Sequence, residues 1–395
     1  MRAKAGIQGM AIKRVAIALL LAVIVCASRA AAAGEFQHAA GARLADALTE
    51  YRAIQARGGW PEIPDGPTLE QGDIGPRIVA LRRRLHATGD LTDRTGREDY
   101  DAGVARAVRR FQARHGLAVD GRVGQQTLVA LNTGVAARIG QLARNLARWE
   151  ALPDLGSAYV LVNTAAMLLE MVDQGPVPPR MPVVVGDRDH PTPVFSSHLA
   201  AIVFNPDWTV PQSIIQKEIL PRLRRDPRYL AANRIRILDR PEDPFGQQVD
   251  WRAPDARLVA RRLRQDPGPG NSLGLIKFDV PNTFDVYLHD TPAKRLFANP
   301  KRAYSHGCIR VSRPRELAAW VLGSDVDSVD RAIASGETTR APVSRDIAVH
   351  VVYLTAFVDP DGTVQFRDDL YGIDGMAAAS ATEAAASIGC GAQRD

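Results

Sequence analysis

The spacing of apolar residues changes near residue 158 and divides the chain into a helical part and a strand-rich part. Before that point, apolar residues recur at helical spacing over 44–51, in three short segments between residues 76 and 132, and over 139–149. After it, short apolar runs are bounded by Gly, Pro and Asp, as is typical of strands. We therefore predict a multi-domain α+β protein in which a β-rich domain follows a helical region.

The three short segments predict one small helical bundle. Pro76 opens the first helix and Gly89 ends it, while Asp101 is the expected N-cap of the second. The apolar faces would carry Ile78, Leu81 and Leu85 in the first helix, Val104, Val108 and Phe111 in the second, and Thr127, Leu128 and Leu131 in the third. Such a bundle either binds a ligand or only supports its neighbour, and periodicity does not distinguish the two.

The strand-rich part contains several short runs and one segment of a different kind. The expected strands cover 159–162, 181–185, 201–204, 275–280, 284–288, 347–352 and 364–366. Phe284, Val286 and Leu288 alternate with polar residues, so we expect them on one face of a strand. Residues 221–270 are rich in Arg and Pro without alternation, which indicates an insertion or lid. A helix is predicted from Pro314 to Gly323.

Composition describes a globular protein with no sign of nucleic-acid binding. The 395 residues are enough for two or three folded units, and 46% hydrophobic with 24% charged residues is ordinary for a soluble protein. The net charge of +6 is scattered along the chain. A basic surface favours anionic partners. Because no nucleic-acid module or basic-aromatic pattern accompanies it, we expect no nucleic acid as a partner.

The N-terminus has the order of a secretory signal. Basic residues up to Arg14 precede an apolar run, Val15–Val25, and then Ala30–Ala33. The run is shorter than the roughly 20 residues of a membrane-spanning helix, which favours cleavage near Ala33 over a retained anchor. We therefore expect a signal peptide at 1–33, removed together with Cys26, an exported protein, and no stable membrane span after cleavage.

Two cysteines then remain, and they differ in their surroundings. Cys390 lies in an Ala/Ser/Gly-rich tail, 376–395, which we expect to be disordered. With only Cys308 besides it, the mature chain is not a disulfide scaffold, and we expect the two thiols to stay unpaired.

Cys308 stands in the most specific segment of the chain, Ser305–Val311, which reads Ser-His-Gly-Cys-Ile-Arg-Val. His289 precedes it at a predicted strand end, and His306 lies two residues before it. A free thiol has a pKa of about 8.5, so an imidazole that takes its proton creates the nucleophile. Spacing alone does not decide which histidine does so.

The neighbours of Cys308 suit acyl transfer. Gly307 lets the backbone approach a substrate, and its amide with that of Cys308 could face an oxyanion. Arg310 could hold a substrate carboxylate in bidentate geometry. Taken singly, a lone Cys is more often an inert small hydrophobe and a strand-end His more often only satisfies hydrogen bonds. Their combination, in an exported chain, favours catalysis.

Two resemblances to known families follow from these motifs. The order Phe111-Gln112, Gly116-Leu117, Asp120-Gly121, Gly124, Thr127 and Leu131-Asn132 resembles the peptidoglycan-binding domain 1 family over about 69–132. His289 followed by Ser305-His306-Gly307-Cys308 and Arg310 resembles the L,D-transpeptidase catalytic domain family. Further matches to its large, multi-domain Gram-negative members are Gly58–Pro61, Asn145-Leu146 with Arg148-Trp149, Pro191-Thr192-Pro193 and Asn205–Pro211.

These resemblances imply a set of domains. They are a helical scaffold at 40–66 and 133–157, a three-helix peptidoglycan-binding domain at 67–132, a β-rich catalytic domain at 158–338 with a capping insertion at about 221–270, and C-terminal strands at 339–375. The implied location is the periplasm, or cell envelope, of a Gram-negative bacterium. The implied partners are peptidoglycan stem peptides and glycan.

The catalytic resemblance also implies a reaction. Cys308 would attack the bond before the fourth-position D-alanine of a tetrapeptide stem, release that D-alanine, and pass the acyl group to another stem as a 3-3 crosslink. The resemblance makes His289 the general base and acid, and it places Ser305, His306, Gly307 and Arg310 around them. Shorter members often carry Asn where Arg310 stands. No cofactor or metal is implied.

Three rival functions remain open. An L,D-carboxypeptidase would use water as acceptor. A zinc-dependent wall peptidase could use His289, Asp290 and His306 as ligands, but no helical His pair with an intervening Glu is present. A wall-binding protein with an inactive catalytic domain would retain the fold alone.

Overall fold

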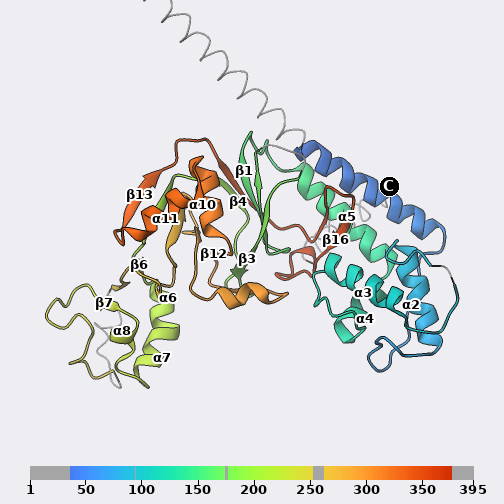
Figure 1. Ribbon diagram of the computed structural model, residues 1–395, viewed down its shortest axis with the longest axis horizontal. Coiled ribbons are helices and arrows are strands. Elements are labelled where there is room, and N and C mark those ends of the chain that lie inside the picture. The colour runs from blue at the N-terminus through green and yellow to red at the C-terminus, as the bar shows by residue number, and fades with distance from the viewer. Residues whose placement is uncertain (1–35, 94, 174–176, 252–261, 376–395) are drawn as a thin grey trace, which may run out of the picture. The chain divides into compact units, whose positions relative to one another are not determined.

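The computed structural model describes residues 36–93, 95–173, 177–251 and 262–375 (Figure 1). The expected signal at 1–33 with Cys26, and the expected tail at 376–395 with Cys390, lie outside these residues. Among the helices of the described part, none is both long and apolar enough to cross a membrane. Helices and a β-rich sheet are both present, which confirms the α+β class.

The chain forms two compact units. The first unit combines the chain up to Pro179 with the chain from His350 onward, and the second runs from Arg180 to Val349. In the first unit residues 36–56 are helical. Its labelled elements are α2 (Pro76–Ala87), α3 (Ala102–Arg114), α4 (Gln125–Asn132), α5 (Val135–Glu150), β1 (Tyr159–Asn163), β2 (Leu168–Val172), β15 (Ala356–Val358) and β16 (Val364–Phe366).

Helices α2, α3 and α4 form the small bundle expected from the sequence (Figure 1). The Asp101 carboxylate accepts a hydrogen bond from the Val104 amide at 2.8 Å and caps α3 as predicted. The predicted apolar faces meet in one core, in which Leu81, Phe111 and Leu131 are fully buried.

Side chains of α5 bind the returning C-terminal segment of the first unit. Gln141 donates to the carbonyls of Thr355 and Arg367 at 3.0 Å, and Asn145 donates to the Thr355 hydroxyl at 2.9 Å. Each amide is buried, so its hydrogen bonds replace those it would make to water. The segment after residue 350 is thereby part of the helical unit.

The second unit is built on a sheet with the strand order β13-β5-β9-β10-β12-β3, and β11 also pairs with β3. Its elements are β3 (Arg180–Gly186), β4 (Phe195–His198), β5 (Ala201–Phe204), β9 (Ile276–Asp279), β10 (Leu288–His289), the 3-10 helix η2 (Lys294–Ala298), β11 (Ala303–Ser305), β12 (Ile309–Val311), α10 (Pro314–Leu322), α11 (Val326–Ala334) and β13 (Thr339–Pro342). Strand β14 (Ala348–Val352) begins in this unit and ends in the first. The β10–β12 and β11–β3 pairings are parallel.

A lobe with its own small core interrupts this sheet between β5 and β9 (Figure 1). It contains β6 (Trp208–Thr209), α6 (Gln212–Ile214), the π-helix η1 (Ile215–Ile219), α7 (Leu220–Leu223), α8 (Tyr229–Ala232), β7 (Ile235–Ile237) and β8 (Leu263–Gln265). Its strands form a separate sheet in the order β6-β8-β7. Its buried residues begin at Val210, eleven residues before the expected start of the insertion at 221.

The strand expected at 284–288 is wrong over most of its length. The structure forms β10 only at Leu288 and His289, and Phe284 is 54% exposed instead of sharing a buried face with Val286. The reason is Asn282, whose side-chain oxygen accepts hydrogen bonds from the amides of Phe284 and Val286 at 2.9 and 3.2 Å. Such side-chain to backbone bonds fold the segment into a turn instead of a strand.

Candidate active site

Cys308 stands in a tight turn between β11 and β12. The Ser305 hydroxyl donates to the Cys308 carbonyl at 2.6 Å and accepts from the Gly307 amide at 3.3 Å. Gly307 has φ +108°, a left-handed conformation that side chains disfavour. The motif therefore fixes the backbone that carries the thiol.

A second hydroxyl, that of Thr192, holds the same turn from outside. It donates to the Gly307 carbonyl at 2.7 Å and accepts from the Gly186 amide at 2.9 Å. Thr192 is 2% exposed. A Cβ on Gly186 would lie 2.0 Å from the His190 carbonyl, so the strand end needs glycine there. Thr192 lies in one of the motifs quoted above, but sequence reasoning gave it no role.

His289 is brought beside this turn by the parallel pairing of β10 with β12. His289 stands in register with Arg310, and Leu288 with Ile309. The imidazole is 5% exposed, and its Nδ1 donates to the Asp290 carbonyl at 2.5 Å. A carbonyl only accepts, so Nδ1 carries the proton and Nε2 is the nitrogen that can take another.

The surroundings of His289 keep it neutral. Burial lowers its pKa to about 3, and the Arg310 guanidinium acts in the same direction, although the carbonyls of Asp290 and Leu273 oppose them. At neutral pH the ring is therefore a base without charge.

The Cys308 thiol is protonated at rest. Burial raises its pKa, while hydrogen bonds from Tyr287 and the charges of Lys277 and Arg310 oppose that effect. Its Sγ also contacts the Asp285 carbonyl at 3.8 Å. The Lys277 ammonium lies 4.6 Å from the ring centroid of Tyr287, so a cation stands near the thiol. A negative charge that develops on sulfur is thus stabilised by the hydrogen bonds from Tyr287 and by the charges of Lys277 and Arg310.

Cys308 opens into a cavity of about 870 Å³ in the second unit. Its wall includes His306 and, among others, Trp208, Lys277, Asp279, Tyr287 and Arg340. Asp279 is paired with both Lys277 and Arg340. The nucleophile and His306 thus face a space large enough for a peptide, whereas His289 is buried.

The Arg310 guanidinium lies near Cys308, and one of its nitrogens is an unsatisfied hydrogen-bond donor within the described part of the chain. Its Nε is buried and, among the described residues, has no hydrogen-bond partner. Burial lowers the pKa of the guanidinium, and the nearby Cys308 and Glu218 raise it. A buried donor without a partner is costly unless a ligand supplies one.

His306 makes contacts that the sequence did not indicate. Its Nε2 lies 3.3 Å from Oε1 of Glu218 in η1, and its ring lies 4.4 Å from that of His190. Glu218 stands in η1 of the lobe, three residues before the expected start of the insertion at 221, and no spacing in the sequence pointed to it.

The three residues considered as zinc ligands have separate partners. His289 binds the Asp290 carbonyl, the Asp290 carboxylate binds the Leu275 amide and the Lys294 ammonium, and His306 binds Glu218. Over the described ranges, no group of three or more His, Cys, Asp or Glu side chains is arranged to hold a metal ion.

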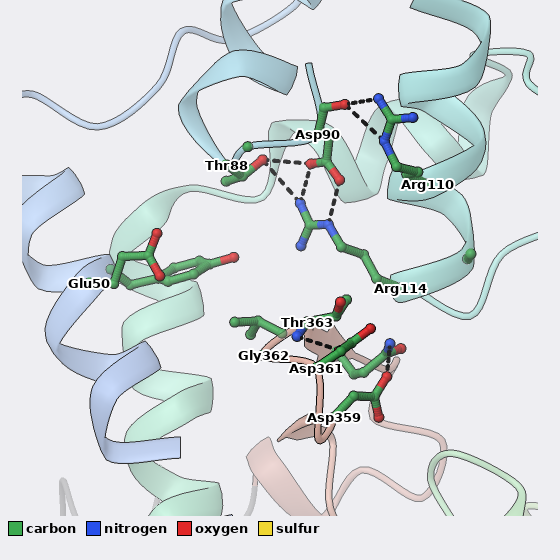
Figure 2. A pocket seen from close by; sticks show the side chains of 14 residues that line it. Glu50, Thr88, Asp90, Arg110, Arg114, Asp359, Asp361, Gly362 and Thr363 are labelled. Carbon is green, nitrogen blue, oxygen red and sulfur yellow. Dashed lines mark hydrogen bonds and ion pairs between the residues drawn. The ribbon is translucent and has the colours of Figure 1, made fainter. Parts of the chain in front are cut away.

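The first unit has a cavity of its own, of about 470 Å³ (Figure 2). Arg114 on its wall binds both carboxylate oxygens of Asp90, at 2.8 and 2.5 Å, and both residues are buried. Arg110 donates to the Asp90 carbonyl. The side chains of Glu50 and Asp361 also line this cavity.

Family comparisons agree with both resemblances. Residues 157–344 match the L,D-transpeptidase catalytic domain family, and residues 74–131 match the family described as "Putative peptidoglycan binding domain". One part of the chain thus matches the L,D-transpeptidase catalytic domain family and another part matches the peptidoglycan-binding family, which confirms the two resemblances found in the sequence.

Individual relatives match parts of the chain. A protein of Haemophilus influenzae named "Putative L,D-transpeptidase" is 34% identical over 240 residues, which cover 59% of this chain and 48% of that protein. The N-acetylmuramoyl-L-alanine amidase CwlM of Mycobacterium tuberculosis is 42% identical over 82 residues, or 18% of this chain and 20% of CwlM. The chain therefore spans about half the length of the first relative and less of the second.

Among solved structures, the L,D-transpeptidase of Stackebrandtia nassauensis is 13% identical, with 77% of this chain and 99% of that one covered and a TM-score of 0.27. L,D-transpeptidase 3 of Mycobacterium tuberculosis is 14% identical, with 49% and 60% covered and a TM-score of 0.24.

Proposed function

We propose that this protein is an L,D-transpeptidase that acts on peptidoglycan tetrapeptide stems through a thioester on Cys308. The observation that carries the proposal is the Cys308 turn, fixed by Ser305, beside a neutral His289 on a parallel strand, inside the region that matches the catalytic family. A relative that shares 34% identity bears the same activity in its name.

In the first half-reaction His289 takes the thiol proton and Cys308 attacks the carbonyl carbon before D-alanine. In the resting structure the thiol contacts Tyr287 and the Asp285 carbonyl. The proposal requires the sulfur to turn toward His289 when substrate binds. Catalytic hydrogen bonds often tighten only in the substrate complex. The protonated imidazole then gives its proton to the leaving amine of D-alanine, and the thioester remains.

The oxyanion of the tetrahedral intermediate would face the amide of Cys308, because the Gly307 amide donates to the Ser305 hydroxyl within the turn. Ser305 and Thr192 hold this turn through two carbonyls and one amide, so its geometry does not reorganise during the reaction. Donors fixed before the reaction stabilise developing charge more than mobile ones.

Arg310 would bind a carboxylate of the stem peptide. Its buried Nε lacks a partner among the described residues, and a carboxylate would supply one in bidentate geometry. Stem peptides carry free carboxylates at D-alanine and at diaminopimelate, the usual third residue of the family's substrates.

The remaining assignments extend this proposal to the whole chain. The bundle at 67–132 would hold glycan or stem peptides close to the catalytic domain at 158–338, with the lobe around 221–270 as its cap. Residues 40–66 and 133–157 would be the scaffold, and 339–375 the C-terminal strands. The signal at 1–33 would direct the protein to the periplasm of a Gram-negative cell. The family matches support peptidoglycan as the partner.

The test is incubation of the purified protein, and of Cys308→Ala, with disaccharide-tetrapeptide fragments, followed by mass spectrometry. Loss of D-alanine with dimer formation in the wild type alone supports the proposal. Tripeptide without dimers would replace it with a carboxypeptidase. Unchanged tetrapeptide in both samples would leave a wall-binding protein. His198→Gln, an exposed histidine on β4, is the matched control.

A further inference from the structure

Two histidines stand near Cys308, and they differ in access. His289 is 5% exposed, whereas the His306 side chain is 30% exposed and lines the same cavity as Cys308. An acceptor amine that enters this cavity reaches His306 without displacing the carbonyls around His289. The two rings are therefore placed for different proton transfers.

Glu218 determines which nitrogen of His306 accepts a proton. Its Oε1 lies 3.3 Å from Nε2 of His306, and because a carboxylate only accepts, it favours the form of the ring with the proton on Nε2 and the lone pair on Nδ1. The other carboxylate oxygen, Oε2, is held by Arg222 at 3.4 Å. A carboxylate on one nitrogen of a histidine base also stabilises the imidazolium that forms.

Glu218 is the group placed to stabilise a protonated His306 ring. His190 packs against the ring at 4.4 Å, but its own nitrogens are engaged by Asp187 at 3.0 Å and by Lys217 at 3.3 Å. Lys217 and Glu218 both belong to η1, a five-residue π-helix. Such segments are frequent at functional sites. The lobe thus contributes a carboxylate to the active site.

We propose that His306, held by Glu218, is the base of the second half-reaction, in which an amine of another stem peptide resolves the thioester. The inference rests on the proposed transpeptidase function and adds a role for the lobe. The amine nitrogen bonds to the thioester carbon, and one of its protons passes to Nδ1 of His306. The carbon–sulfur bond then breaks, and Cys308 leaves as thiolate. His306 then releases this proton and the Cys308 thiolate takes up one, which restores the resting thiol. His306 is a catalytic residue in this scheme, and Glu218 is a positioning residue.

The experiment separates the two half-reactions. Release of D-alanine in the first turnover reports acylation, and dimer formation reports transfer to an amine. For Glu218→Gln we expect release within about twofold of wild type and transfer slowed about 10- to 100-fold, within the range of general base catalysis. For His306→Gln we expect transfer to be slowed more than release. Both side chains are partly exposed, so both variants should fold, as thermal melting will verify. Glu337→Gln, an exposed glutamate of the same unit, is the control.

The rate of transfer to hydroxylamine distinguishes a catalytic role of His306 from a structural one. It is unprotonated at neutral pH and needs little help from a base, so its transfer rate should be the same in wild type and in both variants. Equal losses of D-alanine release and transfer, or an equal loss with hydroxylamine, would overturn the inference. A wild-type enzyme that releases no D-alanine would instead overturn the proposed function itself.

Discussion

Each unit has a cavity with arginines in its wall or beside it, and these arginines differ in how they are satisfied. In the first unit, Arg114 and Asp90 bind each other through two hydrogen bonds, and Arg110 binds the Asp90 backbone (Figure 2). In the second unit, Arg310 has a buried Nε without a partner over the described residues. A buried ion pair that is complete fixes structure, whereas an incomplete one is available to a ligand. We therefore assign stability to the first arginine and substrate binding to the second.

The largest expected effect concerns the base beside the nucleophile. His289→Gln should lower the rate of D-alanine release about 10²- to 10⁴-fold, because the thiol would keep its proton. In the wild type the rate should stay high as pH falls below the ordinary histidine range, because the pKa of His289 is lowered to about 3. The check is a pH–rate profile with His198→Gln as control. Loss of activity with a midpoint near pH 6.5 would contradict the assignment.

The next effect should appear in stability. Arg114→Met leaves the Asp90 carboxylate buried without its cation, and we expect the free energy of unfolding to fall by about 3–5 kcal/mol. Urea unfolding measures this loss. Addition of Asp90→Leu should recover most of it, since the unpaired buried carboxylate is then removed. Arg106→Met, at an exposed position of the same helix, should change stability by less than about 0.5 kcal/mol. A loss of catalytic rate in folded Arg114→Met would weaken the contrast between the cavities.

Arg310→Met should give the opposite result. Removal of a guanidinium whose Nε has no partner should leave the melting temperature unchanged or raise it, while KM for tetrapeptide rises about 10- to 100-fold through loss of a charged hydrogen bond. Steady-state kinetics and thermal melting on one preparation test both parts. Arg331→Met, exposed on α11, is the control. A marked loss of stability without a change in KM would assign Arg310 to structure.

The smallest expected effect is on how steeply the free energy of unfolding changes with pH. Burial, and next the charge of Arg114, hold the pKa of His115 well below its usual value, so the folded protein keeps this ring neutral. The unfolded chain takes up the proton below about pH 6.5. The stabilising contribution is therefore present above that pH and is lost as pH falls. His115→Gln should flatten the decrease in unfolding free energy between pH 7 and 4, while exposed His38→Gln should not.

Local patterns predicted much of this fold. The bundle helices and the Asp101 cap depend on residues close together in sequence, and the structure agrees with them. The segment at Phe284 was misjudged because alternation was taken for a strand, while the Asn282 side chain folds it as a turn.

Long-range contacts could not be predicted in the same way. Thr192 lies 115 residues from Gly307, and Glu218 reaches His306 from η1 of the lobe. Neither residue type is unusual in its local sequence. Only the folded chain places these side chains beside the nucleophile.

The buried setting of Cys308 has a consequence for oxidative damage. Because its pKa is raised, the side chain at neutral pH is a thiol until a proton is taken from it. Peroxides attack the thiolate and convert it first to sulfenic acid and then to forms that are not reduced again. A cysteine enzyme that forms its thiolate only when substrate is bound is therefore protected between turnovers, even where no reducing system restores it.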